Sequence, residues 1–378
     1  MKDRRRSKDR TEQTNKQTMQ TTREYHVALR EWRDSLPFTD EERLAGTRNA
    51  AAAAIGDLDF RLYGKTGVFF NMGTCFYELI RSHSDKHHVY GFGKILLRSP
   101  GAILSLFDDV MGITFGEACL TKNIKVQFLV APEELYARTL RLEAKSAITI
   151  ESTKSTIVTR AEIKSDSGKV LAWSEATFIQ TPELKRQLSM EASLEEQGKE
   201  RTQIWNRLAN VRVAGQSPDD SSMSFVLRTT AGAKTLLAPT DWVPDQGYRI
   251  CEQTHLLDGR VQLGHIGCKH DSCRAVAHPL ITAEGPKGLM HGGCGATTWL
   301  DVLSHEVDLG SIKMIALTYR RPIPLLSTVF IYWNKVNADS WRCELKDPKN
   351  NLLQVVDVTL DDAFRHVSRG ESSGRAHL

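Results

Sequence analysis

A histidine and two glycines stand directly before a helical pattern in the second half of the sequence. The run Gly288-Leu-Met-His-Gly-Gly-Cys-Gly contains His291, Gly292 and Gly293, and Asp301 follows ten residues after the histidine. Free N–H groups at the start of a helix stabilise negative charge, and glycines let a ligand approach the backbone closely. The stretch therefore indicates a catalytic loop, with an ordinary loop histidine as the alternative. It also raises the question of whether Asp301 is the acidic partner of the histidine.

Two adjacent acids in the first half are the other candidates for acid–base chemistry. Asp108 and Asp109 lie within a helical pattern whose other positions are mostly apolar, namely Leu104, Leu106, Phe107, Val110 and Met111. Two solvated acids on a helix are one interpretation. The apolar flanks favour another, in which one acid faces an interface, and we favour Asp108 for that position.

A group of sulfur and imidazole side chains has some features of a zinc site. Cys268, His270 and Cys273 lie close together, with His265 and His278 nearby. The Cys-x4-Cys spacing lacks a second ligand pair, and the segment has the pattern of a hairpin with Lys-His-Asp-Ser at its turn. From the sequence we therefore predict no metal ligands and no bound cofactor.

The elements that position these residues occur twice. The matching pairs are residues 102–115 with 295–307 for a helix, 123–132 with 315–324 for a strand ended by proline, and 160–178 with 342–360 for a hairpin. The hairpin segments align without a gap, and their flanks alternate apolar and polar residues as half-buried strands do. Further strands are expected at 88–97, 248–256 and 261–279. A helix packed on one antiparallel sheet, twice, is an α+β arrangement.

Length and composition favour two such units in one chain. At 378 residues the chain is two to three times the length of a typical domain of about 100–150 residues. We expect a basic, helical extension at 1–65, a first domain at 66–181, a helical linker at 182–223, a second domain at 224–365 and a flexible tail at 366–378. The sequence contains no apolar run long enough for a membrane span. Seven scattered cysteines and the lack of an Asn-x-Ser/Thr acceptor argue against secretion.

Two motifs carry a family resemblance. The run Glu284-Gly-Pro-Lys-Gly-Leu-Met-His-Gly-Gly, followed by a helix and then by Tyr319-Arg-Arg-Pro-Ile-Pro, resembles the hotdog-fold acyl-CoA thioesterases of the PaaI-like group. The first copy is similar to the same fold through Gly101-Ala-Ile-Leu-Ser-Leu-Phe-Asp-Asp-Val-Met-Gly and the strand that begins at Thr121. The resemblance implies two tandem hotdog domains, each a helix wrapped by an antiparallel sheet, forming an intramolecular pseudo-dimer.

The resemblance also implies a site shared between the two copies. In the family, the His-Gly-Gly amides polarise a thioester carbonyl. A carboxylate on the helix of the opposite protomer, nine residues after the histidine position, then activates water or attacks the carbonyl, and a nearby hydroxyl assists. Carried onto this sequence, copy two supplies His291, Gly292 and Gly293, and copy one supplies Asp108 and Thr121. Coenzyme A then enters only as part of the substrate.

The other combination of motifs is incomplete. In copy one Ser99 replaces the histidine, and Pro100, which has no N–H, replaces the first glycine. In copy two Leu300 stands at the carboxylate position, and Asp301 is one residue later. One step along a helix turns a side chain by about 100°, so Asp301 is expected to point away from the site. The resemblance therefore implies one intact site at the interface of the two domains.

Two functions of different class remain open. One is an acyl-CoA thioesterase-like hydrolase, an enzyme acting on acyl-CoA, which we favour. The other is a catalytically reduced hotdog scaffold that serves as a structural subunit or assembly factor of a large complex, such as a mitochondrial ribosome or a respiratory complex. A dehydratase or acyl-CoA-binding role on the same fold is a third interpretation.

The first ten residues bear on the scaffold hypothesis, because they carry six cations against two aspartates. They are interpreted as a solvated arm, as a docking arm within residues 1–65 for protein or RNA, or as a targeting segment. A mitochondrial location is the expectation, with the cytosol as the alternative. A homodimer of double hotdogs is a further expected partner arrangement.

Overall fold

The computed structural model describes residues 68–180 and 261–364 with short gaps, some residues of 31–41, and the backbone of strands between 212 and 251. The chain divides into two compact units, Met1–Leu44 and Ala45–Leu378. In the first unit Glu31, Trp32 and Asp34 are helical, and the Ser35 hydroxyl donates to the Trp32 carbonyl at 2.6 Å. Most of the predicted 1–65 extension with its basic arm, most of the linker and the C-terminal tail lie outside the described residues.

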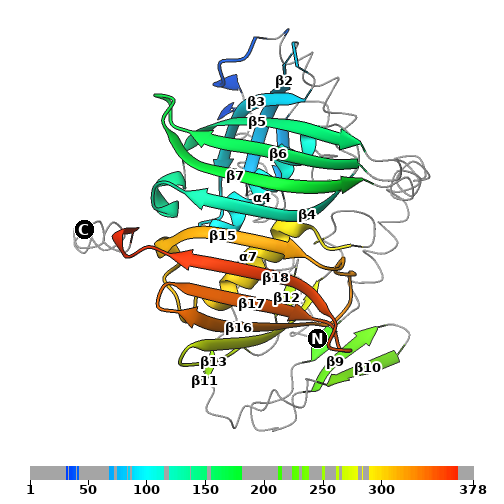
Figure 1. Ribbon diagram of the computed structural model, residues 1–378. Coiled ribbons are helices and arrows are strands. Elements are labelled where there is room, and N and C mark those ends of the chain that lie inside the picture. Colours follow the sequence, from blue (N-terminus) through cyan, green and yellow to red (C-terminus); the bar gives the residue numbers. More distant parts are fainter. Residues whose placement is uncertain are drawn as a thin grey trace, which may run out of the picture. The chain divides into compact units, whose positions relative to one another are not determined.

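The second unit is built on one 15-stranded sheet whose strand pairs are antiparallel throughout the described residues (Figure 1). Its first half contains β1 (Val68–Asn71), β2 (Cys75–Arg81), β3 (His88–Ile95), β4 (Leu120–Phe128), β5 (Thr139–Ile150), β6 (Ser155–Lys164) and β7 (Val170–Gln180). Its second half contains β11 (Arg249–Cys251), β12 (Val261–Leu263), β13 (Ile266–Lys269), β14 (Ser272–Pro279), β15 (Ile312–Tyr319), β16 (Val329–Asn337), β17 (Ser340–Lys346) and β18 (Leu352–Leu360).

The sequence repeat is visible in the strand order. The sheet runs β2-β3-β5-β6-β7-β4 and continues as β15-β18-β17-β16-β14-β13. Counted from the centre, β4, β7, β6 and β5 of the first half therefore correspond to β15, β18, β17 and β16 of the second half. The two aligned hairpins, β6–β7 and β17–β18, occupy corresponding positions. At the centre β4 pairs directly with β15, with Ile124 opposite Leu317. The predicted α+β class with a large antiparallel sheet is confirmed.

Two helices, α4 (Pro100–Ile113) and α7 (Gly292–Leu303), are packed against the sheet and against each other. A Cβ built on Gly101 would lie 2.4 Å from the Thr297 Cα, and one on Gly293 would lie 2.6 Å from the Ser105 Cα. Both distances are too short for real atoms, so the close approach of the helices requires glycine at both positions. Buried apolar residues of both halves form one contiguous core. Neither helix is long and apolar enough to cross a membrane, and the same holds for every other helix among the described residues.

Both helices begin earlier than the apolar periodicity predicts, at residues 100 and 292 instead of 102 and 295. The cause is local capping. Ser99 Oγ accepts the Gly101 N–H at 3.2 Å, and His291 Nδ1 accepts the Gly293 N–H at 3.1 Å. A side chain that accepts a free amide lets the helix start before its first apolar residue.

A second correction concerns the linker. Residues 182–213 have a helical pattern, yet β8 (Arg212–Ala214) is a strand. It joins β9 (Ser224–Thr229) and β10 (Gly232–Leu237) in a separate three-stranded sheet. Val213 pairs with Leu227 there, and such a cross-strand pair overrides the weak local preference for helix. Two 3-10 turns, η1 (Pro132–Leu135) and η3 (Leu309–Ser311), complete the described elements.

Candidate active site

His291 is the N-cap residue of α7, and both of its ring nitrogens are engaged. Nδ1 accepts the Gly293 N–H at 3.1 Å, and Nε2 lies 3.0 Å from Asp109 Oδ1. A ring nitrogen that accepts an N–H carries no proton, so Nε2 carries the ring proton and donates a hydrogen bond to the Asp109 carboxylate. Through these two hydrogen bonds the His291 ring links the first turn of α7 to Asp109 on α4. Its side chain is 19% exposed and that of Asp109 is 12% exposed.

Asp109 receives a second hydrogen bond, from the Tyr77 hydroxyl at 3.2 Å. The sequence reasoning singled out Asp108 of the two acids and missed this role of Asp109. The available signal was the repeat itself, because Asp109 and Asp301 stand ten residues after Ser99 and His291, respectively. Tyr77, one of several residues with a polar group in β2, carries no comparable signal.

Asp108 is 7% exposed and lies one residue before Asp109 on α4. Its Oδ1 accepts a hydrogen bond from Thr121 Oγ1 at 2.8 Å. Burial raises the pKa of Asp108 to about 6, and the charge of Asp109 acts in the same direction, whereas His291 and the Thr121 hydroxyl lower the pKa. A carboxylate with such a pKa is ionised at neutral pH and still basic enough to accept a proton.

Gly292 lies beside Asp108, although the two residues come from different halves of the repeat. A Cβ built on Gly292 would lie 3.1 Å from Asp108 Oδ2 and 2.3 Å from the Tyr319 hydroxyl oxygen. The Gly292 N–H, the first amide of α7, has no hydrogen-bond partner among the described residues. The four predicted residues His291, Gly292, Asp108 and Thr121 are thus brought together.

The role of Gly293 differs from the expectation. Its amide was predicted to face the reacting carbonyl together with that of Gly292, but it donates to His291 Nδ1 instead. The absence of a side chain at Gly293 is explained by the approach of Ser105, whose Oγ would lie 2.0 Å from a Cβ there. Gly293 therefore orients the histidine and lets the helices pack, and Gly292 is the residue next to the carboxylate.

Two further polar side chains of the second half, Tyr319 and Gln354, lie near Gly292. The Tyr319 hydroxyl and the Gln354 side-chain amide are both buried. The two residues face each other across β15 and β18, and Gln354 Oε1 accepts from Trp299 Nε1 at 2.7 Å. Burial and the charge of Asp108 raise the pKa of Tyr319 well above its ordinary value, outweighing a hydrogen bond with Gln354 that lowers it, so the phenol keeps its proton. Only the strand register, which the sequence does not fix, reveals this pair.

The corresponding groups of the other motif set do not form such an arrangement. Ser99 Oγ is used to cap Gly101, Pro100 offers no N–H, and Leu300 is fully buried. Asp301 is 2% exposed, and burial raises its pKa to about 7. The Asp301 carboxyl group is therefore protonated and uncharged at pH values below about 7. Asp301 is not the carboxylate bonded to His291, which is Asp109.

Comparison with known proteins found matches among solved structures but none among sequence families. No family model matches the sequence, and no curated protein matches it. Acyl-CoA thioesterase II TesB2 from Mycobacterium marinum is 9% identical with a TM-score of 0.39, and the match covers 76% of this chain and 98% of that one. The TesB protein of Mycobacterium avium subsp. paratuberculosis is 9% identical with a TM-score of 0.41, covering 75% and 96%.

The Drosophila melanogaster peroxisomal multifunctional enzyme type 2 is 10% identical with a TM-score of 0.34. The match covers 64% of this chain, which spans 37% of the length of that enzyme.

Proposed function

We propose that the protein is an acyl-CoA thioester hydrolase with one active site between two tandem hotdog units. In this proposal α4 and α7 take the places of the central helices of two protomers, and the sheet that joins β4 to β15 takes the place of a dimer sheet. The observation that carries the proposal is the position of Gly292, at the N-terminus of α7, beside the Asp108–Thr121 pair of the other half.

The reaction begins with the thioester carbonyl oxygen directed at the Gly292 N–H. The helix N-terminus and the protonated Tyr319 hydroxyl, which lies next to Gly292, supply the donors for the developing oxyanion. Because Gly292 has no side chain, the Tyr319 hydroxyl and the Asp108 carboxylate lie directly against the start of the helix. Gly293 and Asp109 contribute by fixing His291 and, through it, the start of the helix.

Asp108 acts as general base. Its carboxylate takes a proton from water, the resulting hydroxide oxygen bonds to the thioester carbon, and the tetrahedral intermediate expels the thiolate of coenzyme A. The proton held by Asp108 then passes to the thiolate, so that a carboxylic acid and a free thiol leave. Thr121 holds the carboxylate in place through the 2.8 Å hydrogen bond to Oδ1, and Oδ2 is the atom that lies on the Gly292 side.

The test is a panel of acyl-CoA substrates of graded chain length, with release of free thiol as the readout. Wild-type protein is expected to turn over part of the panel. Asp108→Asn is expected to lower kcat by about 10²–10⁴-fold, the usual contribution of a general base. Asp301→Asn serves as the matched control, because it changes a buried helix carboxylate outside the site and should leave kcat within about threefold. A folded wild-type protein that hydrolyses no member of the panel contradicts the proposal and favours the scaffold alternative.

A further inference from the structure

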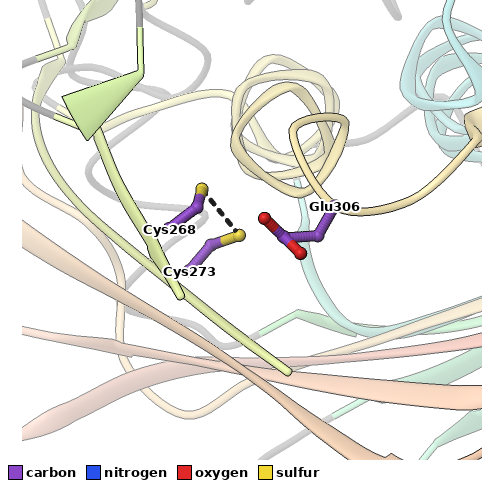
Figure 2. Close-up of side chains that lie close together, drawn as sticks. All are labelled: Cys268, Cys273 and Glu306. Atoms are coloured by element: carbon purple, nitrogen blue, oxygen red, sulfur yellow. Dashed lines mark hydrogen bonds between the residues drawn. The ribbon is translucent and has the colours of Figure 1, made fainter. Parts of the chain in front are cut away.

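Two cysteines and a glutamate converge at the β13–β14 hairpin. Cys268 and Cys273 are direct partners across the two strands, and their sulfur atoms lie 2.9 Å apart. Glu306 comes from the segment that follows α7. Figure 2 shows its carboxylate pointing toward the two sulfurs. The one ligand atom that each residue offers lies within 4.8 Å of the other two.

The surroundings of this cluster do not resemble those of solvated acidic groups. Cys268 and Cys273 are 1% and 0% exposed, and Glu306 is half-buried. Without an ion the Cys268 thiol keeps its proton and donates it in a hydrogen bond to the Cys273 sulfur. A bound divalent cation would displace the thiol protons and stabilise the thiolates as its ligands.

The types of ligand atom select the cation. Thiolates prefer zinc-like ions over magnesium or calcium, and zinc accepts carboxylate as well. Zinc–sulfur bonds are about 2.3 Å long, so ligand atoms of one ion lie within roughly twice that length of each other. The three ligand atoms lie within 4.8 Å of one another, slightly beyond that span, so small side-chain shifts would bring them onto one ion. We propose that Cys268, Cys273 and Glu306 bind a zinc-class divalent ion, with water as the remaining ligand and release of the two thiol protons.

The sequence pattern argued against this site because the Cys-x4-Cys spacing lacks a second ligand pair nearby in the sequence. His270, between the two cysteines, lies at the hairpin turn with a side chain that is 89% exposed and is paired with Asp271. Glu306 is 33 residues beyond Cys273 and reaches the hairpin only through the position of α7. A bound ion would tie the end of α7 to the hairpin. The start of that helix carries His291, but the metal site itself does not depend on the proposed hydrolase.

The experiment uses full-length protein purified under reducing conditions. It is loaded with Zn²⁺ or Co²⁺, desalted, and analysed for bound metal by mass spectrometry. We expect about one ion per chain and, with Co²⁺, a thiolate charge-transfer absorption band. Cys268→Ser and Cys273→Ser should abolish the band. Glu306→Gln should weaken Zn²⁺ binding by more than the ~10–100-fold that loss of an outer-shell partner costs.

Cys75→Ser is the matched control, since Cys75 is equally buried but lies on β2 in the first half. This variant should keep the ion and the absorption band. Circular dichroism identifies any variant that fails to fold, and Glu306→Gln, at a half-buried position, tests the site independently of the cysteines. Wild-type protein with reduced thiols that binds no Zn²⁺ or Co²⁺ overturns the proposal. So does an unchanged Co²⁺ spectrum in Cys268→Ser.

A disulfide is the competing outcome for the two sulfurs. Protein purified without reductant would then have a mass lower by two hydrogen atoms and two fewer titratable thiols, and it would take up no metal after reduction. That combination also overturns the proposal. Turnover of acyl-CoA is not a readout here, so failure of the metal site is distinguishable from failure of the proposed hydrolase.

Discussion

His291 Nε2 donates to Asp109 Oδ1 at 3.0 Å, although the two residues are 182 positions apart in the sequence. The bond joins the N-terminus of α7 to α4, and it leaves Asp108, the neighbouring acid, for the site. Because Nδ1 of the same ring caps the helix, one side chain couples the two halves of the repeat and orients the loop that carries Gly292.

This coupling is separable from helix capping. Ser99, at the corresponding place before α4, caps its helix with a hydroxyl. We therefore expect His291→Ser to keep the cap but lose the bond to Asp109, and His291→Ala to lose both. The alanine variant should be less stable than the serine variant by about 1 kcal/mol, the usual value of an N-cap. Urea denaturation measures the difference, and both variants should show a lower kcat. Full activity in His291→Ser would contradict the orienting role of the Asp109 bond.

The pH dependence of the hydrolysis follows from Asp108. Its pKa is raised to about 6, and the base works only as the carboxylate, so kcat should fall as the pH drops below about 6. The Thr121 hydroxyl favours the ionised form, and its removal in Thr121→Val should raise the pKa. A hydrogen bond to a charged group contributes about 1.5–3 kcal/mol, so the profile should move to higher pH by about one unit or more.

Thr121→Ser is the control for that shift, because it keeps the hydroxyl and should keep the wild-type profile. The measurement is kcat between pH 5 and 8 for the three proteins. A profile that does not move in Thr121→Val would show that the 2.8 Å bond to Asp108 does not set the titration of the base.

The two glycines of the loop should respond differently to alanine. In Gly292→Ala the new methyl group meets the Tyr319 hydroxyl and Asp108 Oδ2, so activity should fall by at least about tenfold with a small change in melting temperature. In Gly293→Ala the methyl group meets the backbone of Ser105, which cannot move away without separating the helices. That variant should lose about 1–3 kcal/mol of stability, as overpacked cores do. Thermal unfolding and kcat, measured on both, distinguish the roles; equal effects would argue against the assignment.

Asp301 should make stability depend on pH. Its folded pKa is about 7, above the ordinary value of 3.8, so the neutral acid favours folding. That contribution is fully present below pH 3.8 and is lost as the pH rises through 7. At about 1.4 kcal/mol for each pH unit between the two pKa values, the ionised form costs on the order of 4 kcal/mol. Asp301→Asn should therefore be more stable than wild type at pH 8, and the gain should shrink toward pH 4. Urea denaturation at both pH values tests this, and a gain independent of pH would refute it.

The sequence determined the elements and their repetition. Alternating strand patterns around polar turns and two helices preceded by short loops depend on local chemistry, and a repeat of 19 aligned positions makes them recognisable. The pairing of Asp108 with Thr121 and the proximity of Gly292 were also predictable, because the resemblance of each copy to a known fold implied a site across the interface.

Only the tertiary structure decided which atoms meet. The assignment of Asp109 to His291, the use of the Gly293 amide as a cap donor and the meeting of Tyr319 with Gln354 depend on register and on side-chain direction. The same is true of Glu306 and the two cysteines. A contact between residues far apart along the chain is set by how helices and strands pack, and packing at the level of single atoms leaves no periodic trace in the sequence.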